Sequence, residues 1–329
     1  MDLISLDGPT FKQAVATGDV YERLASPSGS VVVVEADDLP DRLDVGDMER
    51  LSTLPAVVVA QTSTPGRFPL WADLVAAPDD PVADVVANTV ATHPLASIVL
   101  TLLLRTGGGR TIAEGLVAES TAYGLLQSGP EFARWRASRL VRSGAGDDGP
   151  PVLVTRNDGE LEVTLHRPAV HNALNSAMRD SLAEALAIAA HDPSITVVHL
   201  RGAGDSFCGG GDLDEFGTRS DPASAHLLRM LISPARSVAA VAERTVAHLH
   251  GATMGSGIEL AAFAHRVIGT QSTQIALPEV HLGLIPGAGG TVSLPRRIGR
   301  HRTLRLALSP EPIDVGTALE WGLLDEVVD

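Results

Sequence analysis

The sequence predicts an α/β fold, because segments typical of strands and of helices alternate along the chain. In the second half, β-branched runs alternate with stretches in which apolar residues recur at helical spacing. These helices and strands are predicted at 175–190, 195–200, 223–242, 245–250, 257–264 and 265–269. Strands that alternate with helices favour parallel pairing within a layered sheet.

A β-hairpin is predicted at the start of this second half. Residues 152–155 and 161–165 have the composition of strands, and they flank the turn sequence Asn157-Asp158-Gly159. An Asn-Asp-Gly run supplies the residues that tolerate the backbone angles of a tight turn. The hairpin therefore opens the second half of the fold.

The first half has a fainter version of the same alternation. Strands are predicted at 31–34 and 56–60, separated by a short helix around 48–54. Residues 81–139 have helical spacing throughout, with breaks expected at Pro94 and at the glycines of 107–109. This half carries no carboxylate beside a glycine-rich turn.

Composition changes most sharply at residues 143–151. Small, acidic and proline residues replace the periodic apolar pattern there, which is typical of a linker. A length of 329 residues also favours two domains over one. We therefore expect a domain at 1–142, a linker at 143–151 and a second domain at 152–329.

Charge and composition exclude several classes of function. The net charge is -15, and no basic cluster of the kind that binds nucleic acid is present. Cys208 is the single cysteine, so an intrachain disulfide is impossible. The longest apolar run, at 98–104, is too short to span a bilayer, and the acidic start lacks the basic residues of a secretory signal. We expect a cytoplasmic protein that binds neither nucleic acid nor membrane.

Two glutamates beside glycine-rich turns are the candidate catalytic residues. Glu259 ends the glycine-rich segment 251–259, and Glu279 precedes a second one at 283–290. Two carboxyl groups held by such turns can act as a pair, one as the general acid and the other as the general base. A third glycine cluster, at 207–213, can present bare N–H groups to a developing oxyanion. On these residues alone, two surface carboxylates are the simpler interpretation.

Five segments, taken in order, resemble the crotonase (enoyl-CoA hydratase/isomerase) superfamily. They are residues 165–175, 197–213, 250–260, 276–291 and 318–328. The resemblance thus covers residues 160–328, and five blocks in one order are more specific than a single glycine-rich run. It implies a crotonase-like ββα spiral core with a helical packing segment.

The resemblance implies an enzyme that acts on acyl-CoA thioesters and stabilises an enolate-like species. The main-chain N–H groups of Gly211 and Ser256 would form its oxyanion hole, although the family usually has glycine at the latter position. Glu259 and Glu279 match the positions that family hydratases use to add water, which favours hydration of 2-enoyl-CoA. We assign Glu279 as the proton donor to C2 and Glu259 as the group that activates water.

Substrate-binding residues also follow from the resemblance. CoA would contact the segments 167–175 and 207–209, with His171 near the phosphates, while apolar side chains would line the acyl chain. The full set is His171, Ala173, Leu174, Cys208, Gly209, Leu213, Phe216, Leu282 and Leu284. No metal is implied, and no cofactor beyond the coenzyme A of the substrate. We expect the protein to form a homo-oligomer, either a trimer or a dimer of trimers. We also expect it to act in fatty acid metabolism.

Residues 1–142 are expected to hold a degenerate crotonase-like unit. The chain ends at Asp329, where family members continue into C-terminal helices that close the CoA site, and residues 82–139 resemble those helices. Segments 54–60 and 72–76 resemble core strands. An unrelated helical extension is the alternative. For the site itself, the alternatives are isomerisation, decarboxylation or hydrolysis of a CoA thioester, or a non-catalytic CoA-binding scaffold.

Overall fold

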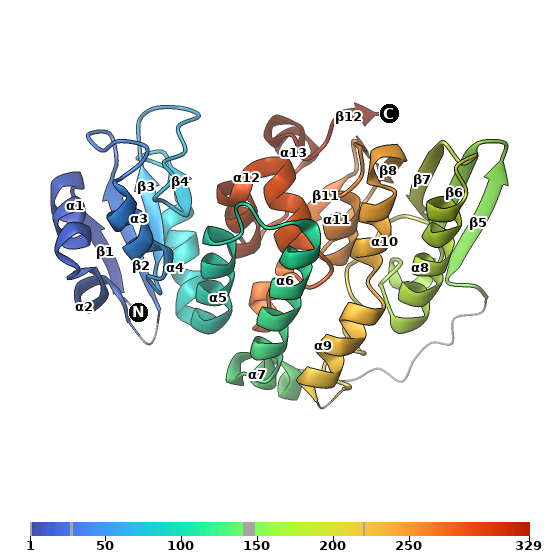
Figure 1. The fold of residues 1–329 in the computed structure, drawn as a ribbon, viewed down its shortest axis with the longest axis horizontal. Coiled ribbons are helices and arrows are strands. Elements are labelled where there is room, and N and C mark those ends of the chain that lie inside the picture. The colour runs from blue at the N-terminus through green and yellow to red at the C-terminus, as the bar shows by residue number, and fades with distance from the viewer. Residues whose placement is uncertain (1, 27–28, 141–148, 220) are drawn as a thin grey trace.

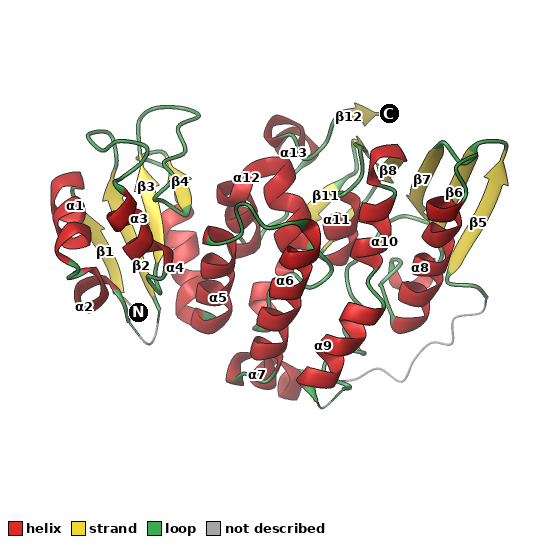
Figure 2. Cartoon of the chain, viewed as in Figure 1, coloured by secondary structure: helices red, strands yellow, loops and turns green. Residues whose placement is uncertain are grey.

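The computed structural model describes residues 2–26, 29–140, 149–219 and 221–329. Its two larger sheets lie toward opposite ends of an elongated molecule, and most helices lie between them (Figure 1). Strands and helices alternate along both halves of the chain (Figure 2). The α/β fold class is confirmed, and every strand pair except the hairpin is parallel.

The N-terminal sheet has four parallel strands in the order β1-β2-β3-β4. Its elements are β1 (Asp2–Leu6), α1 (Gly8–Thr17), α2 (Val20–Leu24), β2 (Ser30–Glu35), α3 (Val45–Ser52), β3 (Val57–Gln61) and β4 (Leu74–Ala76). Strands β2 and β3 are valine-rich and buried on both faces, as parallel strands covered by helices require. They confirm the two predicted strands, while β1 and α1 are additional elements.

Four helices follow the first sheet: α4 (Val82–Thr92), α5 (Pro94–Arg105), α6 (Ile112–Gln127) and α7 (Pro130–Ser138). The breaks predicted at Pro94 and at the glycines of 107–109 are confirmed. Helix α6 begins with a capping box in which Thr111 and Glu114 bind each other's backbone N–H groups. Within the described residues, no single helix is long and apolar enough to cross a membrane; α4 and α5, bent by 118°, reach that length only together.

The second half forms a six-stranded sheet in the order β12-β10-β8-β7-β6-β5 and a two-stranded sheet of β11 and β9. The strands are β5 (Val152–Asn157), β6 (Glu160–Leu165), β7 (Val197–Gly202), β8 (Thr245–Leu249), β9 (Ala252–Met254), β10 (Arg266–Thr270), β11 (Gln274–Ala276) and β12 (Glu326–Val328). The helices are α8 (Ser176–His191), α9 (Pro222–Leu231), α10 (Pro234–Ala240), α11 (Ser256–Ala261), α12 (Gly290–Leu308) and α13 (Val315–Trp321). The predicted hairpin is confirmed as β5 and β6.

One predicted helix is wrong in its extent. Residues 223–242 form two helices, α9 and α10, rather than one. Pro234 cannot donate a backbone hydrogen bond in a helix interior, so it starts a new helix instead. The Ser233 side chain caps that helix by accepting from the N–H of Arg236.

Helices from the first half pack directly against α12 of the second half. The Thr89 hydroxyl on α4 donates to the carbonyl of Leu308 at 2.8 Å. Asp73, which is 1% exposed, pairs with Arg105 on α5 and lies 3.5 Å from Arg300 on α12. One hydrophobic core therefore contains residues of both halves. The proposed domain boundaries stay a prediction, because residues 141–148, most of the expected linker, lie outside the described residues.

Candidate active site

Glu259 lies on α11 and is bound to the turn that begins α12. Its Oε2 accepts hydrogen bonds from the main-chain N–H groups of Ala288, at 2.7 Å, and Gly290, at 2.8 Å. The side chain is 1% exposed. A Cβ added to Gly290 would lie 2.6 Å from Glu259 Cγ, so only glycine leaves room for this approach. The glycine-rich turn thus fixes the position of one carboxyl group.

Glu279 lies on the short 3-10 helix η3 (Pro278–Leu282), which follows β11. Its carboxyl group meets Gly255, where a Cβ would overlap Oε1. Gly255 also has φ +47°, in the left-handed region that favours glycine. The other oxygen, Oε2, is buried and has no hydrogen-bond partner among the described residues. A buried carboxyl oxygen without a donor is stabilised in its protonated form.

A third buried carboxyl group, Glu119, comes from α6 of the first half. It accepts from the N–H of Gly289 at 2.7 Å and from the N–H and hydroxyl of Thr291 at 2.9 and 2.7 Å. Glu119 is 2% exposed. These donors are orphan groups at the start of α12, where a negative charge is favoured. The N-terminal half therefore helps to hold the turn that binds Glu259.

Burial raises the pKa of all three glutamates. The pKa of Glu279 rises to about 7, and that of Glu119 also to about 7. Burial, followed by the charges of Glu279 and Glu119, raises the pKa of Glu259 well above its usual range. Close carboxyl groups in a dry site share protons, because ionising one opposes ionisation of the next. The two N–H donors at Glu259 favour its charged form, whereas Glu279 Oε2 has none.

Gly211 and Ser256 lie at the same cavity as the two glutamates. Among the described residues, no acceptor is bound to the main-chain N–H of either one. Ser256 is the first residue of α11, where a backbone N–H has no partner within the helix. A Cβ on Gly211 would lie 2.6 Å from the ring of Phe216, so this backbone also needs glycine. Two free donors thus border the cavity.

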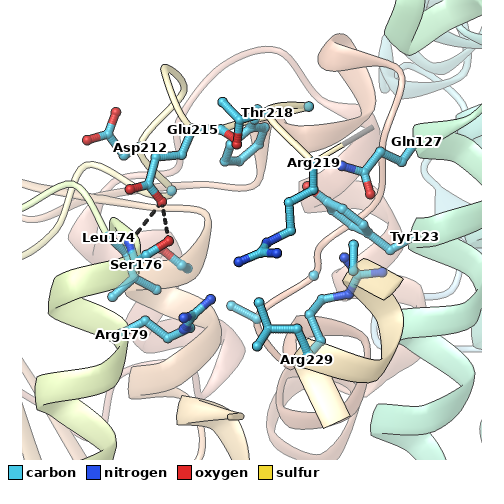
Figure 3. A pocket seen from close by; sticks show the side chains of 18 of the residues that line it. Tyr123, Gln127, Leu174, Ser176, Arg179, Asp212, Glu215, Thr218, Arg219 and Arg229 are labelled. Carbon is cyan, nitrogen blue, oxygen red and sulfur yellow. Dashed lines mark hydrogen bonds between the residues drawn. The ribbon is translucent and has the colours of Figure 1, made fainter. Parts of the chain in front are cut away.

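The cavity has a volume of about 210 Å³, and both halves of the chain line it (Figure 3). Of the predicted site residues, it brings together Glu259, Glu279, Gly211, Ser256, Leu174 and Phe216. From α6 come Tyr123 and Gln127. Three arginines, Arg179, Arg219 and Arg229, also line it. The walls are therefore more polar than an apolar acyl tunnel.

Other predicted substrate-binding residues lie outside this lining. His171 is exposed, and its Nδ1 lies 3.0 Å from the Ser206 hydroxyl. Gly209, which is also exposed, donates its N–H to the His171 carbonyl, and Ala173 is half-buried. Cys208 is buried, and burial raises the pKa of its thiol to about 11. The side chain therefore packs in the core rather than facing a ligand.

Only part of the predicted acyl-chain wall lies at this cavity. Leu284 is fully buried in the hydrophobic core and has no surface to offer a substrate. Leu213 and Leu282 are half-buried and do not line the cavity. Phe216 does line it, next to Gly211.

Sequence reasoning missed Glu119, Tyr123 and the three arginines. The spacing of α6 contained a signal, because Leu116, Glu119, Tyr123 and Leu126 recur at helical intervals. A glutamate within such an apolar stripe is rarely buried unless it has partners. Its partners lie about 170 residues further along the chain, which no local pattern reveals.

The fold and these residues define the class of protein. The family described as enoyl-CoA hydratase/isomerase matches residues 155–329. This match covers more than half of the chain, and the chain belongs to that family. The resemblance to the crotonase superfamily is confirmed over this segment.

Curated relatives and solved structures agree with this assignment. The chain is 35% identical over 176 residues to 2,3-dehydroadipyl-CoA hydratase of Escherichia coli, covering 54% of the chain and 68% of the relative. It is 36% identical over 168 residues to the peroxisomal bifunctional enzyme of Danio rerio, covering 51% of the chain but only 22% of that protein. A putative enoyl-CoA hydratase/isomerase from Mycobacterium abscessus superposes with a TM-score of 0.51 at 34% identity, covering 54% of this chain and 70% of that one.

Proposed function

We propose that the protein hydrates 2-enoyl-CoA thioesters to 3-hydroxyacyl-CoA. The observation that carries this proposal is the convergence of two buried carboxyl groups, Glu259 and Glu279, and two free main-chain N–H groups on one cavity. Hydration needs this set: an oxyanion site for the thioester oxygen, a base for water and an acid for carbon.

The N–H groups of Gly211 and Ser256 bind the thioester oxygen and stabilise the enolate. Glu259, whose charged form the N–H groups of Ala288 and Gly290 favour against the burial that raises its pKa, draws a proton from water as the water oxygen bonds to C3. The C2=C3 electron pair moves toward the thioester, and Glu279 then delivers its proton to C2. The product gains one water, and one proton passes from Glu259 to Glu279 to restore the starting state.

Coenzyme A enters as part of the substrate, and the mechanism requires no further cofactor. Isomerisation is the second candidate, favoured by the 34% identity to 1,2-epoxyphenylacetyl-CoA isomerase of Escherichia coli over 52% of the chain. A single carboxyl group that carries a proton between two carbons suffices for a double-bond shift. The two reactions share the oxyanion site.

The test is to incubate the protein with a series of 2-enoyl-CoA thioesters and analyse the products by mass spectrometry. We expect products heavier by one water. Products of unchanged mass would indicate isomerisation, and released CoA thiol would indicate thioester hydrolysis. Thioester binding without any product would contradict an enzymatic role and favour a CoA-binding scaffold.

A further inference from the structure

Three arginine side chains surround the cavity that holds the glutamates. Arg179 comes from α8, Arg229 from α9, and Arg219 from the segment before α9. Figure 3 shows all three around one space, with Arg219 between the other two. Three guanidinium groups weaken the binding of a plain hydrocarbon chain. Each of them loses its hydration when the chain fills the space, and the chain offers no hydrogen bond in return.

Two of these arginines have no acid in ion-pair contact. Neither Arg219 nor Arg229 forms an ion pair within the described residues. Arg229 is instead held by Ser120, whose hydroxyl accepts from Nε at 2.8 Å. Its guanidinium carbon lies 4.9 Å from the ring centroid of Tyr123. The guanidinium is thus oriented, and the charge of Glu119 acts on it without an ion-pair contact.

Besides Glu259 and Glu279, the cavity wall contains the acids Asp212 and Glu215, and both have hydrogen-bond partners. Asp212 accepts from Arg167 at 3.0 Å, and Glu215 accepts from the N–H and hydroxyl of Ser176. In Figure 3 both acids lie near Ser176 and Arg179, across the space from Arg229. Arg179 pairs with Asp180, its half-buried neighbour in sequence, at 2.8 Å. An ion pair of this partly exposed kind is weak and leaves other donors of the guanidinium available.

A second, smaller chamber adjoins the first. Its volume is about 160 Å³, and Leu174, Arg179, Arg229, Gly287 and Ala288 line both spaces. The rest of its wall is largely apolar, with Leu116, Met230, Ile232, Pro234 and Ala235, and it also contains the polar side chains of Glu119, Ser120 and Ser233. An acyl group that extends from the glutamates toward this chamber passes both Arg179 and Arg229.

We propose that the acyl chain of the substrate ends in a carboxylate, which Arg179, Arg219 and Arg229 bind. The substrate class is then the CoA monothioesters of 2-unsaturated dicarboxylic acids. This inference rests on the proposed function for the reaction, but it concerns only the far end of the acyl group. A guanidinium matches a carboxylate with two parallel N–H donors, and such charge-assisted bonds are strong in a partly dry site.

The phosphates of coenzyme A are the other anion that these arginines could bind. The acyl-chain carboxylate and the coenzyme A phosphates are distinguished with thioesters that carry the same coenzyme A but differ at the end of the acyl chain. Glutaryl-CoA is matched with pentanoyl-CoA, and adipoyl-CoA with hexanoyl-CoA. All four are saturated, so binding is measured without turnover and does not depend on the reaction proposed above.

The experiment is calorimetric titration of the full-length protein, its Arg229→Gln and Arg219→Gln variants, and Arg201→Gln as control. Arg201 lies on β7, is paired with Glu162 of β6, and does not line the cavity. We expect at least one carboxylated thioester to bind about 10-fold more tightly than its neutral match, as a charge-assisted pair would give. Both cavity variants should remove that preference while neutral thioesters bind as before.

Two outcomes would overturn the proposal. One is equal affinity of the wild-type protein for carboxylated and neutral thioesters. The other is a loss of affinity in Arg229→Gln and Arg219→Gln that is the same for both kinds of thioester and for free coenzyme A, which would assign the arginines to the phosphates. Arg219→Gln keeps the test valid if Arg229→Gln fails to fold, because Arg219 is exposed at the surface.

Discussion

Glu119 and Glu259 bind alternate N–H groups of a single turn. Glu259 accepts from Ala288 and Gly290, whereas Glu119 accepts from Gly289 and Thr291. One glutamate belongs to the family core and the other to α6 in the first half of the chain. The turn is therefore held from both sides, and the position of Glu259 depends on a residue 140 positions before it in the sequence.

We expect Glu119→Ala to destabilise the protein and to reduce kcat. The substitution leaves the buried N–H groups of Gly289 and Thr291 without acceptors, at about 1–3 kcal/mol each. The turn then loses one of its two anchors, so kcat should fall by about 10-fold or more while KM changes less. Urea unfolding and steady-state kinetics measure both effects.

The control for Glu119 is Glu114→Gln on the same helix. Glu114 is exposed, and glutamine can still accept the Thr111 N–H in the capping box, so this substitution should change stability little and leave kcat unchanged. Glu119→Gln retains one acceptor oxygen and should fall between the wild type and Glu119→Ala. An unchanged kcat in Glu119→Ala would show that the turn needs no support from α6.

Gly255→Ala is expected to impair catalysis through Glu279. The new Cβ would overlap Glu279 Oε1, and alanine is also strained at φ +47°. We expect kcat to fall by more than about 10-fold, since a misplaced acid transfers its proton poorly. Gly18→Ala is the matched control, because φ is +83° there and nothing lies within 4 Å. Similar kinetics in the two variants would mean that strain alone, rather than contact with Glu279, determines the effect.

Stability should decrease as pH rises through neutrality. The pKa of Glu279 is about 7 in the folded protein and 4.5 as its ordinary value, so the native state holds the proton to higher pH than the unfolded state. Its contribution is fully present below about pH 4.5 and is lost as pH rises through 7. For a shift of this size the loss is about 3 kcal/mol.

Glu279→Gln should flatten this pH dependence of the free energy of unfolding. Denaturant titrations at pH 5.5 and 8.5 compare the variant with the wild type and with Glu162→Gln, a control on the outer face of β6 where the carboxylate is exposed. The wild type and the control should lose stability between the two pH values, and Glu279→Gln should lose less. An equal loss in all three proteins would place the titrating group elsewhere.

The second half should not fold to an active protein without the first. Its helix α12 is covered by α4, α5 and α6, and the Thr89 and Glu119 contacts cross between the halves. We expect residues 149–329 expressed alone to be insoluble or inactive, and co-expression with residues 1–140 to restore soluble protein. A soluble and fully active fragment 149–329 would contradict the packing role of the N-terminal helices.

The fold of the second half could be predicted because its signals are local. β-branched runs, the Asn157-Asp158-Gly159 turn and helical spacing each act within about ten residues. Pro234 does indicate the break between α9 and α10, since proline ends a helix. The apolar residues keep their helical spacing across Pro234, however, and this spacing favoured one continuous helix. The strands β9 and β11 have three residues each, too few for an alternation of apolar and polar residues to be recognised in the sequence.

The site was predictable only in part, for a different reason. Glu259, Glu279, Gly211 and Ser256 sit in glycine-rich segments whose order along the chain identifies the family. Glu119, Tyr123 and Arg229 reach the cavity only through the packing of α6 and α9 on the core. Their role depends on tertiary contacts, so the residue types alone could not assign it.

The paired action of Glu259 and Glu279 is tested most directly by the kinetics of Glu259→Gln and Glu279→Gln with 2-enoyl-CoA thioesters. Glutamine keeps the shape of each side chain but removes its ability to accept or donate the proton. We predict that each substitution lowers kcat for hydration by about 10²- to 10⁴-fold with KM little changed. Hydration that proceeds at the wild-type rate in both variants would contradict the account.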